Sequence, residues 1–334
     1  MVPSLADESA LLAELRELAQ QGRYRGLIER LESVPAPVVE DHAPLALLAA
    51  EAHGRLGDHD AAERLAGRAL DLARRRLDPR AELRATHIRG AIAWQRGNTE
   101  EAETDFQHAL EQARTLGDAA AQARASNNLG ILHDLRGATE IALASYQLAL
   151  ASYQQAGDLR GMAETHHNMS ISWVALGVPR RARRAAEQAV RLALQVGDPT
   201  LLGLALIGRA VADLALGDPA LAAAELERAA ATYERVAFTA GFPEIRRVQA
   251  AVARARGDLA GAVLLLTEAA AASQRAGAPL HTLAEIERDL GDALATQGDH
   301  AGARAARERG LTLFRRLGAR RAAAALEALL SAAN

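Results

Sequence analysis

The sequence predicts an all-α fold, a right-handed α-solenoid of stacked antiparallel helix hairpins. Three observations support this prediction: a glycine that returns about every forty residues, small residues that keep in register with it, and a composition rich in alanine and poor in aromatic residues. Seven glycines, called the turn glycines below, define the repeat: Gly57, Gly97, Gly137, Gly177, Gly217, Gly257 and Gly298.

Three further columns of small residues keep a fixed distance from the turn glycines. Alanine stands five residues after each of them and twelve residues after six of them, and Gly310 takes that second place after Gly298. A small residue stands seven positions before each turn glycine: Ala50, Gly90, Gly130, Ser170, Ala210, Ala250 and Gly291. Four columns in register over seven units indicate a repeat protein.

The columns predict how each unit folds. The turn glycine ends a first helix, because a residue without Cβ adopts the left-handed conformation most easily. The small residues before and after it let two antiparallel helices cross closely. A second break, at "LGD" 116–118, "AGD" 156–158 and "VGD" 196–198, separates each hairpin from the next. We therefore expect a helix, a short turn, a longer second helix and a short connection, stacked on neighbouring units.

Composition excludes several classes of function. Hydrophobic residues make up 49% of the chain and aromatic residues 3%, so the core must consist of alanine and leucine. The absence of cysteine excludes disulfides and thiolate metal sites. All 39 basic residues are arginine, which excludes the lysine of a P-loop, a Schiff base or a kinase. A net charge of −3 argues against direct nucleic-acid binding.

The chain also lacks motifs for catalysis or membrane insertion. The pair His166–His167 has no HExxH spacing around it, and no nucleophile elbow or phosphate-binding loop is present. The N-terminus does not have the pattern of a signal peptide, and the apolar stretch at 201–208 is too short to span a bilayer. We therefore expect a cytoplasmic protein that is not an enzyme and has no cofactor, no metal and no membrane contact.

The spacing resembles the tetratricopeptide repeat family over residues 43–318, most closely at 126–198, where "NNLG", Tyr146 and the alanine columns coincide. The forty-residue period is similar to the long-helix variety in kinesin light chains, bacterial peptide-pheromone receptors and large bacterial transcription activators. The resemblance implies a superhelix whose concave groove is lined by the first helices. Most units lack the family's early Trp and its Pro, and Arg307 stands where an aromatic or aliphatic residue usually packs.

Three domains are expected. Residues 1–42 form an N-terminal helical hairpin and a proline-rich connector, residues 43–318 form seven hairpins, and residues 319–334 form a C-terminal capping helix. The segment "YERVAFTAGFPEIRR" at 233–247 has no glycine at the expected connection, so it predicts a local kink with a packing role.

A candidate binding face follows from helical spacing. Residues thirteen, ten, nine, six and two positions before a turn glycine share one face of the first helix, and the resemblance implies that this face lines the groove. An asparagine amide both donates and accepts hydrogen bonds, so Asn128 and Asn168, one unit apart, could pair with an extended peptide backbone. The candidate groove residues are Arg84, His87, Arg124, Asn127, Asn128, Ile131, Glu164, His167, Asn168, Ile171, Leu204, Ile207 and Val211.

Each part of this face has an alternative interpretation. The amides could instead join neighbouring helices, since buried polar groups need partners in either case. Arg84 and Arg124 could attract a carboxylate or be solvated, and the patch of Leu204, Ile207 and Val211 could seat an apolar side chain or close the superhelix.

Two functions remain from different classes. The first is a regulatory or sensory protein–protein interaction scaffold that binds a peptide or protein segment in the groove. The second is a self-associating regulatory module of a bacterial transcription or signalling system, with DNA contacted by another chain or domain. The expected partner is a protein or peptide, and homo-oligomer formation stays open.

Overall fold

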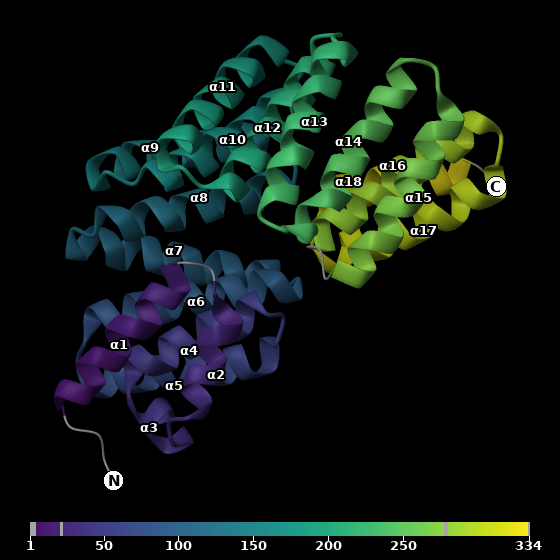
Figure 1. The fold of residues 1–334 in the computed structure, drawn as a ribbon. Helices are drawn as coiled ribbons and strands as arrows, with labels where there is room; N and C mark the ends of the chain where they lie inside the picture. Colours follow the sequence, from purple (N-terminus) through teal and green to yellow (C-terminus); the bar gives the residue numbers. More distant parts are fainter. Residues whose placement is uncertain (1–4, 21–22, 277–279, 333–334) are drawn as a thin grey trace. The chain divides into compact units, whose positions relative to one another are not determined.

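The computed structural model is all-α: residues 5–20, 23–276 and 280–332 are described, and no strand occurs among them. The described chain divides into two compact units, residues 1–125 and 126–334. The boundary falls within helix α8 (Ala119–Leu135). Each unit is built from consecutive antiparallel helices joined by short turns (Figure 1). The predicted all-α repeat fold is therefore confirmed.

The first unit begins with a helical pair and continues into helix hairpins. In it α4 contacts α5, α6 contacts α7, and the first helices α4 and α6 contact each other. Its helices before α8 are α1 (Leu5–Gln20), α2 (Tyr24–Glu32), α3 (Ala36–Asp41), α4 (Ala43–Arg55), α5 (His59–Arg75), α6 (Pro79–Arg96) and α7 (Thr99–Leu116).

The second unit contains the rest of the repeat. After α8 its helices are α9 (Thr139–Ala156), α10 (Leu159–Ala175), α11 (Pro179–Val196), α12 (Pro199–Ala215), α13 (Pro219–Arg235), the 3-10 helix η1 (Thr239–Gly241), α14 (Phe242–Ala255), α15 (Leu259–Ala276), α16 (Leu280–Gln297), α17 (His300–Arg316) and α18 (Arg320–Ala332).

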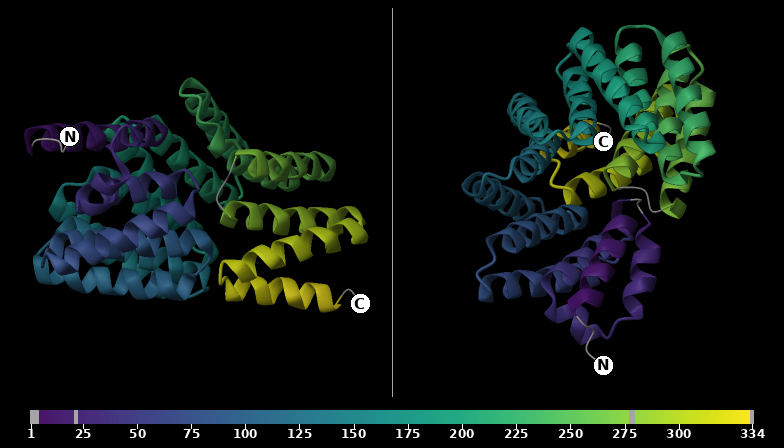
Figure 2. Two further views of the ribbon diagram at one scale, coloured as in Figure 1. Left: turned by 90° about the horizontal axis from the view of Figure 1, so that it is seen from below. Right: turned by 60° about the vertical axis from the view of Figure 1, so that its left-hand side comes forward.

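The first helices of this unit form a continuous layer. Helix α10 contacts α12, α12 contacts α14, and α14 contacts α16, while each second helix contacts the first helix that follows it. The second helices lie on the other side of this layer (Figures 1 and 2). Residues at equivalent positions of successive first helices are therefore neighbours in space.

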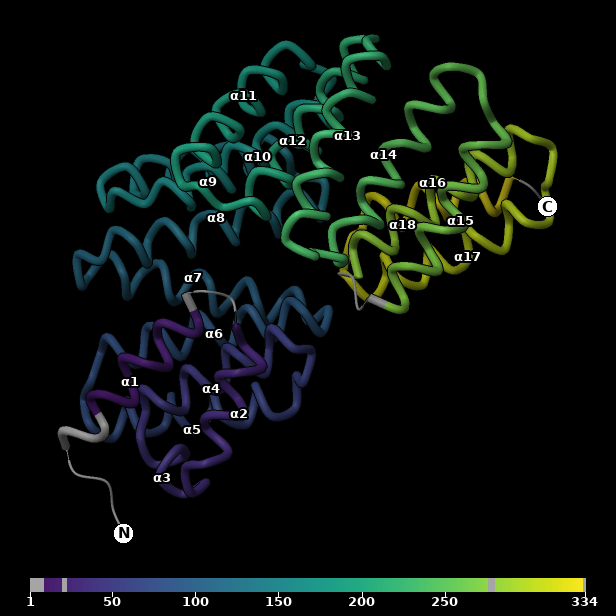
Figure 3. Tube along the Cα trace, in the orientation of Figure 1, coloured from purple at the N-terminus to yellow at the C-terminus, as the bar shows by residue number. Residues whose placement is uncertain are grey.

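The turn glycines have the backbone conformation that the sequence predicts. All seven have positive φ, from 72° at Gly177 to 93° at Gly298. The second break of the repeat uses the same conformation at Gly117, Gly157 and Gly197. The Cα trace bends tightly between consecutive helices (Figure 3), and a glycine at a helix end adopts the left-handed conformation without a Cβ penalty.

Two residues with side chains occupy the second break where glycine is missing. Leu77 has a φ of 53° and Ala237 a φ of 52°, each one period away from a glycine at that break. Residues with Cβ adopt this conformation at a cost of roughly 1–2 kcal/mol. The backbone requirement of the repeat thus outweighs the local preference of these two residues.

The small residues seven before the turn glycines explain the close crossing of each hairpin. At Gly90, Gly130 and Gly291 this small residue faces a large one, which stands nine residues after the same turn glycine. A Cβ built on Gly130 would lie 2.5 Å from Tyr146 Cε1, and one built on Gly90 would lie 3.0 Å from the Phe106 ring. Where Ala210 replaces glycine, the facing position holds Leu226.

Arg307 also fills the space beside a small residue, but with an aliphatic stem in place of an aromatic ring. Its Cγ would lie 2.7 Å from a Cβ on Gly291, so the arginine stem fills the space taken by aromatic rings elsewhere. Its guanidinium reaches Asp292 Oδ1 at 3.0 Å. The expected longer second helix is found in the hairpins α4–α5, α8–α9, α10–α11 and α14–α15, whereas the two helices are equal in α6–α7 and α12–α13 and the second is shorter by one residue in α16–α17.

The irregular segment after α13 is held by aromatic packing. The ring centroid of Tyr233 lies 5.0 Å from that of Phe238 and 6.3 Å from that of Phe242, both edge-on. Edge-on aromatic pairs contribute about 0.5–1.5 kcal/mol beyond their buried area. Tyr233 is 2% exposed, so this cluster acts in packing.

In two hairpins an arginine eight residues before the turn glycine pairs with a buried carboxylate eight residues after it. Arg209 Nη2 lies 2.6 Å from Glu225 Oε2, with side chains that are 13% and 7% exposed. Arg89 pairs with Asp105 at the equivalent positions of the first unit. Three other hairpins have Leu129 and Ser145, Met169 and Ala185, and Gln249 and Leu265 at these positions.

Replacing one partner of the buried pair should destabilise the second unit. Glu225→Ala leaves Arg209 charged and unpaired, which we expect to cost about 3 kcal/mol of unfolding free energy in urea titrations. The double variant Arg209→Met/Glu225→Leu, built from residues that sister hairpins use, should lie within about 1 kcal/mol of the wild type. A double variant as unstable as Glu225→Ala would show that the ion pair itself is required.

Candidate functional site

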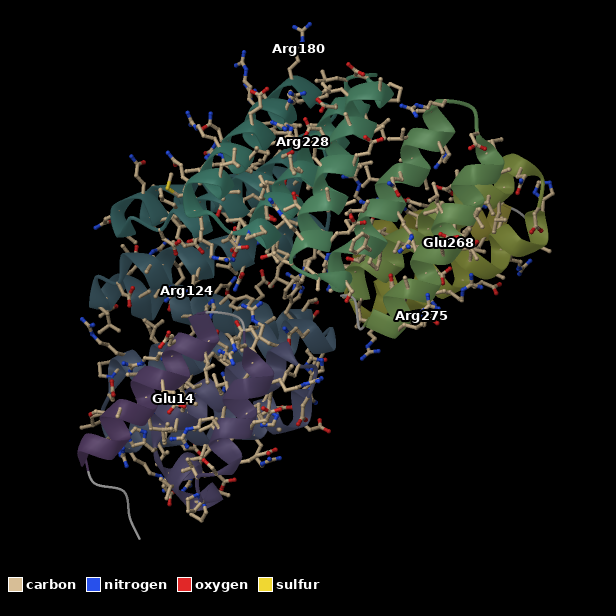
Figure 4. The ribbon with its side chains drawn as sticks, viewed as in Figure 1. Glu14, Arg124, Arg180, Arg228, Glu268 and Arg275 are labelled. Carbon is tan, nitrogen blue, oxygen red and sulfur yellow. The ribbon has the colours of Figure 1, made fainter. Side chains whose placement is uncertain are left out.

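Of the thirteen candidate groove residues, three belong to the first unit. Arg84 lies 3.5 Å from Glu51 on α4, and Arg124 is exposed (Figure 4). The His87 ring packs on Phe106 with centroids 5.6 Å apart. Desolvation lowers the pKa of His87 to about 4, and the charges of Arg124 and Arg55 contribute to this shift.

The other ten lie in the second unit, where the amides of α8 and α10 meet. Asn127 is 7% exposed, and its Oδ1 accepts a hydrogen bond of 3.2 Å from Asn168 Nδ2. Thr165 Oγ1 lies 3.1 Å from the same oxygen. The amides of Asn127 and Asn168 therefore join two neighbouring first helices, as the alternative interpretation expected. Asn128 is half-buried on the adjacent position of α8.

The row of asparagines stops at α12 for a steric reason. The position equivalent to Asn128 and Asn168 is Gly208, and a Cβ there would lie 2.5 Å from His167 Nδ1. The imidazole of His167 thus occupies the space that the next amide would need. Its Nδ1 is buried and has no hydrogen-bond partner among the described residues. Desolvation lowers the pKa of His167 to about 4, and Glu244 opposes this shift.

The apolar candidates differ in their accessibility. Ile207 is 2% exposed and belongs to the core, whereas Leu204 and Val211 are half-buried on α12. Ile171 on α10 is 40% exposed, Ile131 on α8 is half-buried against the core, and Glu164 pairs with Arg160. Only part of the predicted apolar patch can therefore contact a ligand.

The structure reveals a charged cluster that the sequence interpretation missed. It lies on α14 and α16 and consists of Glu244, Arg247, Glu285, Arg288 and Asp289, here called the charged cluster.

Ion pairs connect all its members. Arg247 Nη2 lies 2.6 Å from Glu244 Oε1, and Arg247 Nη1 lies 3.0 Å from Asp289 Oδ2. Arg288 pairs with Glu285 and, at 2.8 Å, with Asp289.

The side chains of the charged cluster are partly buried but still reached by solvent. The side chains of Glu244 and Arg247 keep 28% and 19% of their surface accessible, yet desolvation is the largest influence on both pKa values. For Glu244 desolvation is outweighed by Arg247, so its pKa lies below the usual value. For Glu285 desolvation prevails over Arg288 and Arg247, and its pKa is raised. Desolvation also lowers the pKa of His281, next to Glu244.

The same positional rule would have found this cluster. Glu244 and Arg247 stand thirteen and ten residues before Gly257. Glu285, Arg288 and Asp289 stand thirteen, ten and nine residues before Gly298. We call the face formed by these positions on α8, α10, α12, α14 and α16 the inner face of the second unit.

Helix α11, a second helix of the repeat, carries several arginines that do not belong to the inner face. Arg183 pairs with the buried Asp213, and the Arg181 guanidinium lies 4.8 Å from the Trp173 ring centroid. Arg180 is exposed and extends away from the ribbon (Figure 4). Helix α11 therefore uses part of its charge to hold α12.

The described part of the chain contains no candidate membrane span and no candidate metal site. None of its helices is long and apolar enough to cross a membrane. No group of three or more His, Asp or Glu side chains within residues 5–20, 23–276 and 280–332 could hold a metal ion.

Comparisons with known proteins identify the class. Residues 82–155 match the family model described as tetratricopeptide repeat. No curated protein matches the sequence.

Solved structures resemble the whole chain. A Rap protein complexed with competence and sporulation factor aligns with a TM-score of 0.64 at 14% identity, covering 97% of each chain. The apo quorum sensor NprR from B. thuringiensis aligns with a TM-score of 0.65 at 15% identity, covering 91% of this chain and 86% of that one. The Rap conjugation gene regulator of the plasmid pLS20, in complex with the Phr* peptide, aligns at 0.63 and 17% identity, covering 81% and 71%.

Fold and comparisons together define a helical repeat protein with stacked hairpins. More particularly, residues 82–155 carry tetratricopeptide repeats, and the chain has a tetratricopeptide-like α-solenoid fold. Identities of 14–17% establish similarity of fold alone.

Stability should decrease as the pH falls because of His167. Its folded pKa of about 4 lies below the ordinary 6.5, so the unfolded chain takes up a proton first as the pH falls. Stability from the neutral ring is complete above pH 6.5 and is lost between pH 6.5 and 4, with about 2 kcal/mol lost by pH 5. His167→Gln should remove this part of the difference between urea titrations at pH 7 and pH 5.

His108→Gln, at an exposed position of α7, is the matched control and should leave that difference unchanged. An equal pH dependence in the wild type and His167→Gln would contradict the assigned environment of His167.

Proposed function

We propose that the protein is a non-enzymatic cytoplasmic interaction scaffold that binds a peptide or protein segment on the inner face of the second unit, in a regulatory or sensory role. The main observation in support is that accessible amide, apolar and charged groups follow one another on adjacent first helices. Two of the similar solved structures support the proposal, because one is a quorum sensor and the other is a conjugation gene regulator in complex with a peptide.

Three sectors of the inner face offer different chemistry. Asn128 on α8 offers an amide for a peptide backbone. Leu204 and Val211 on α12 offer accessible apolar surface. The charged cluster on α14 and α16 contains three carboxylates and two guanidiniums, so it has a formal excess of one negative charge. A ligand with an apolar side chain and a cationic group fits this order.

Helix spacing sets the distance between these ligand groups. Packed helices lie about 8–10 Å apart, and an extended peptide advances about 3.3 Å per residue. One step from helix to helix therefore corresponds to about three ligand residues. A cationic group roughly three to six residues from the apolar side chain would reach the charged cluster.

A selection from a random peptide library tests the proposal while the ligand is unidentified. Peptides enriched on the wild-type protein should lose roughly tenfold or more in affinity for Leu204→Asp, because a buried apolar contact is worth about 1.5–3 kcal/mol. Asn128→Ala should lose about fivefold, the value of one hydrogen bond of about 1 kcal/mol. Fluorescence anisotropy measures both.

The control is Leu194→Asp, the same change at a 58% exposed position of the outer helix α11. It should bind the enriched peptides like the wild type. Equal affinities for Leu204→Asp and wild type, or a selection that enriches no peptide, would contradict binding at the inner face.

A further inference from the structure

The C-terminal helix α18 contacts the turn between α8 and α9, far away in sequence. Leu135, at the end of α8, packs against the apolar cluster that includes Phe314, Leu317 and Leu326. A Cβ built on Gly137 would lie 2.6 Å from Arg321 Cδ and 2.9 Å from Arg321 Cβ. The aliphatic stem of Arg321 therefore lies directly on the Gly137 backbone.

Five of the other turn glycines lack such a contact. At Gly57, Gly177, Gly217, Gly257 and Gly298 a Cβ would meet nothing within 4 Å. These residues share the positive φ of Gly137, so the turn geometry does not require a covering side chain. Gly137 differs because α18 returns to it.

Helix α18 packs on its hairpin partner α17 through a small apolar cluster. Ala323 and Leu326 are its buried residues, and the ion pair of Arg315 with Glu327 at 2.7 Å is exposed. Exposed ion pairs contribute little to stability. The contacts at Leu135 and Gly137 add to this packing, so their loss should let α18 open more often.

We propose that α18 is an intramolecular latch that closes the second unit on itself and is coupled to occupancy of the inner face. All first helices from α8 to α16 lie between the two ends of this contact, so latch closure fixes their mutual spacing. A ligand that bridges α10, α12, α14 and α16 favours one spacing, and so favours one latch state. By linkage, a change in latch closure changes ligand affinity to the same extent. This coupling rests on the proposed function, whereas the latch itself does not.

Hydrogen exchange on the full-length protein tests the latch without a ligand. Gly137→Asn and Gly177→Asn both replace a left-handed glycine by a residue that tolerates this conformation, so their backbone cost is the same. Only the first of these two substitutions brings the new side chain against Arg321. Amides of α18 should exchange about tenfold faster in Gly137→Asn and at the wild-type rate in Gly177→Asn. Equal exchange of α18 in the two variants would overturn the latch.

A second variant decides the question if Gly137→Asn does not fold. Arg321→Ala removes the stem without altering the turn, and should also accelerate exchange in α18 and in residues 135–138 together. Arg316→Ala, at an exposed position of α17, is its control. Unchanged exchange in Arg321→Ala would overturn the latch.

The coupling has a separate readout. Peptides selected on the wild-type protein should bind the latch-open variant with an affinity changed by about threefold or more, and bound peptide should change α18 exchange by the same factor. Unchanged affinity in a variant with released α18 overturns the coupling and leaves the proposed function standing. Failure to select any peptide rejects the proposed function. The latch is then judged by the hydrogen-exchange experiments alone.

Discussion

The close crossing of the two helices in each hairpin is the constraint on which the rest of the structure depends. Core side chains are mostly alanine and leucine, so burial requires the backbones to approach closely. The small residue before each turn glycine permits that approach, and at Gly90, Gly130 and Gly291 a large facing residue fills the space that remains. Glycine faces the rings of Phe106 and Tyr146 and the stem of Arg307, whereas Ala210 faces Leu226. Different side chains thus produce one repeated geometry.

This geometry determines where function can reside. Because hairpins with the same crossing stack in the same way, α10, α12, α14 and α16 contact their neighbours directly and form one layer. A residue ten positions before its turn glycine then meets the residue nine positions before the next turn glycine: Asn127 bonds to Asn168, His167 lies against Gly208, and Arg247 pairs with Asp289. The chemistry of the inner face can vary from helix to helix while the fold stays constant, which suits recognition of an extended ligand.

The periodic features could be predicted from the sequence, because left-handed glycines and close crossings restrict residue type at fixed positions. Contacts between successive hairpins could not be predicted. The bond from Asn168 to Asn127 depends on side-chain torsions, and the sequence left two interpretations of those amides open. The charged cluster was missed because the positional rule was not extended to α14 and α16. The contact of Arg321 with Gly137 depends on the curvature of the whole second unit, which no local pattern encodes.

A double-mutant cycle at Gly130 and Tyr146 tests the crossing constraint most directly. In the wild type, Gly130→Ala places a methyl group against the Tyr146 ring and should destabilise the protein by about 1–3 kcal/mol. In the Tyr146→Leu background, which reproduces the size of the Ala210–Leu226 pair, the same change should be neutral or stabilise the helix by up to about 1 kcal/mol. Urea unfolding of the four proteins gives the coupling. A reversal of sign between the two backgrounds supports the account, and an equal destabilisation in both contradicts it.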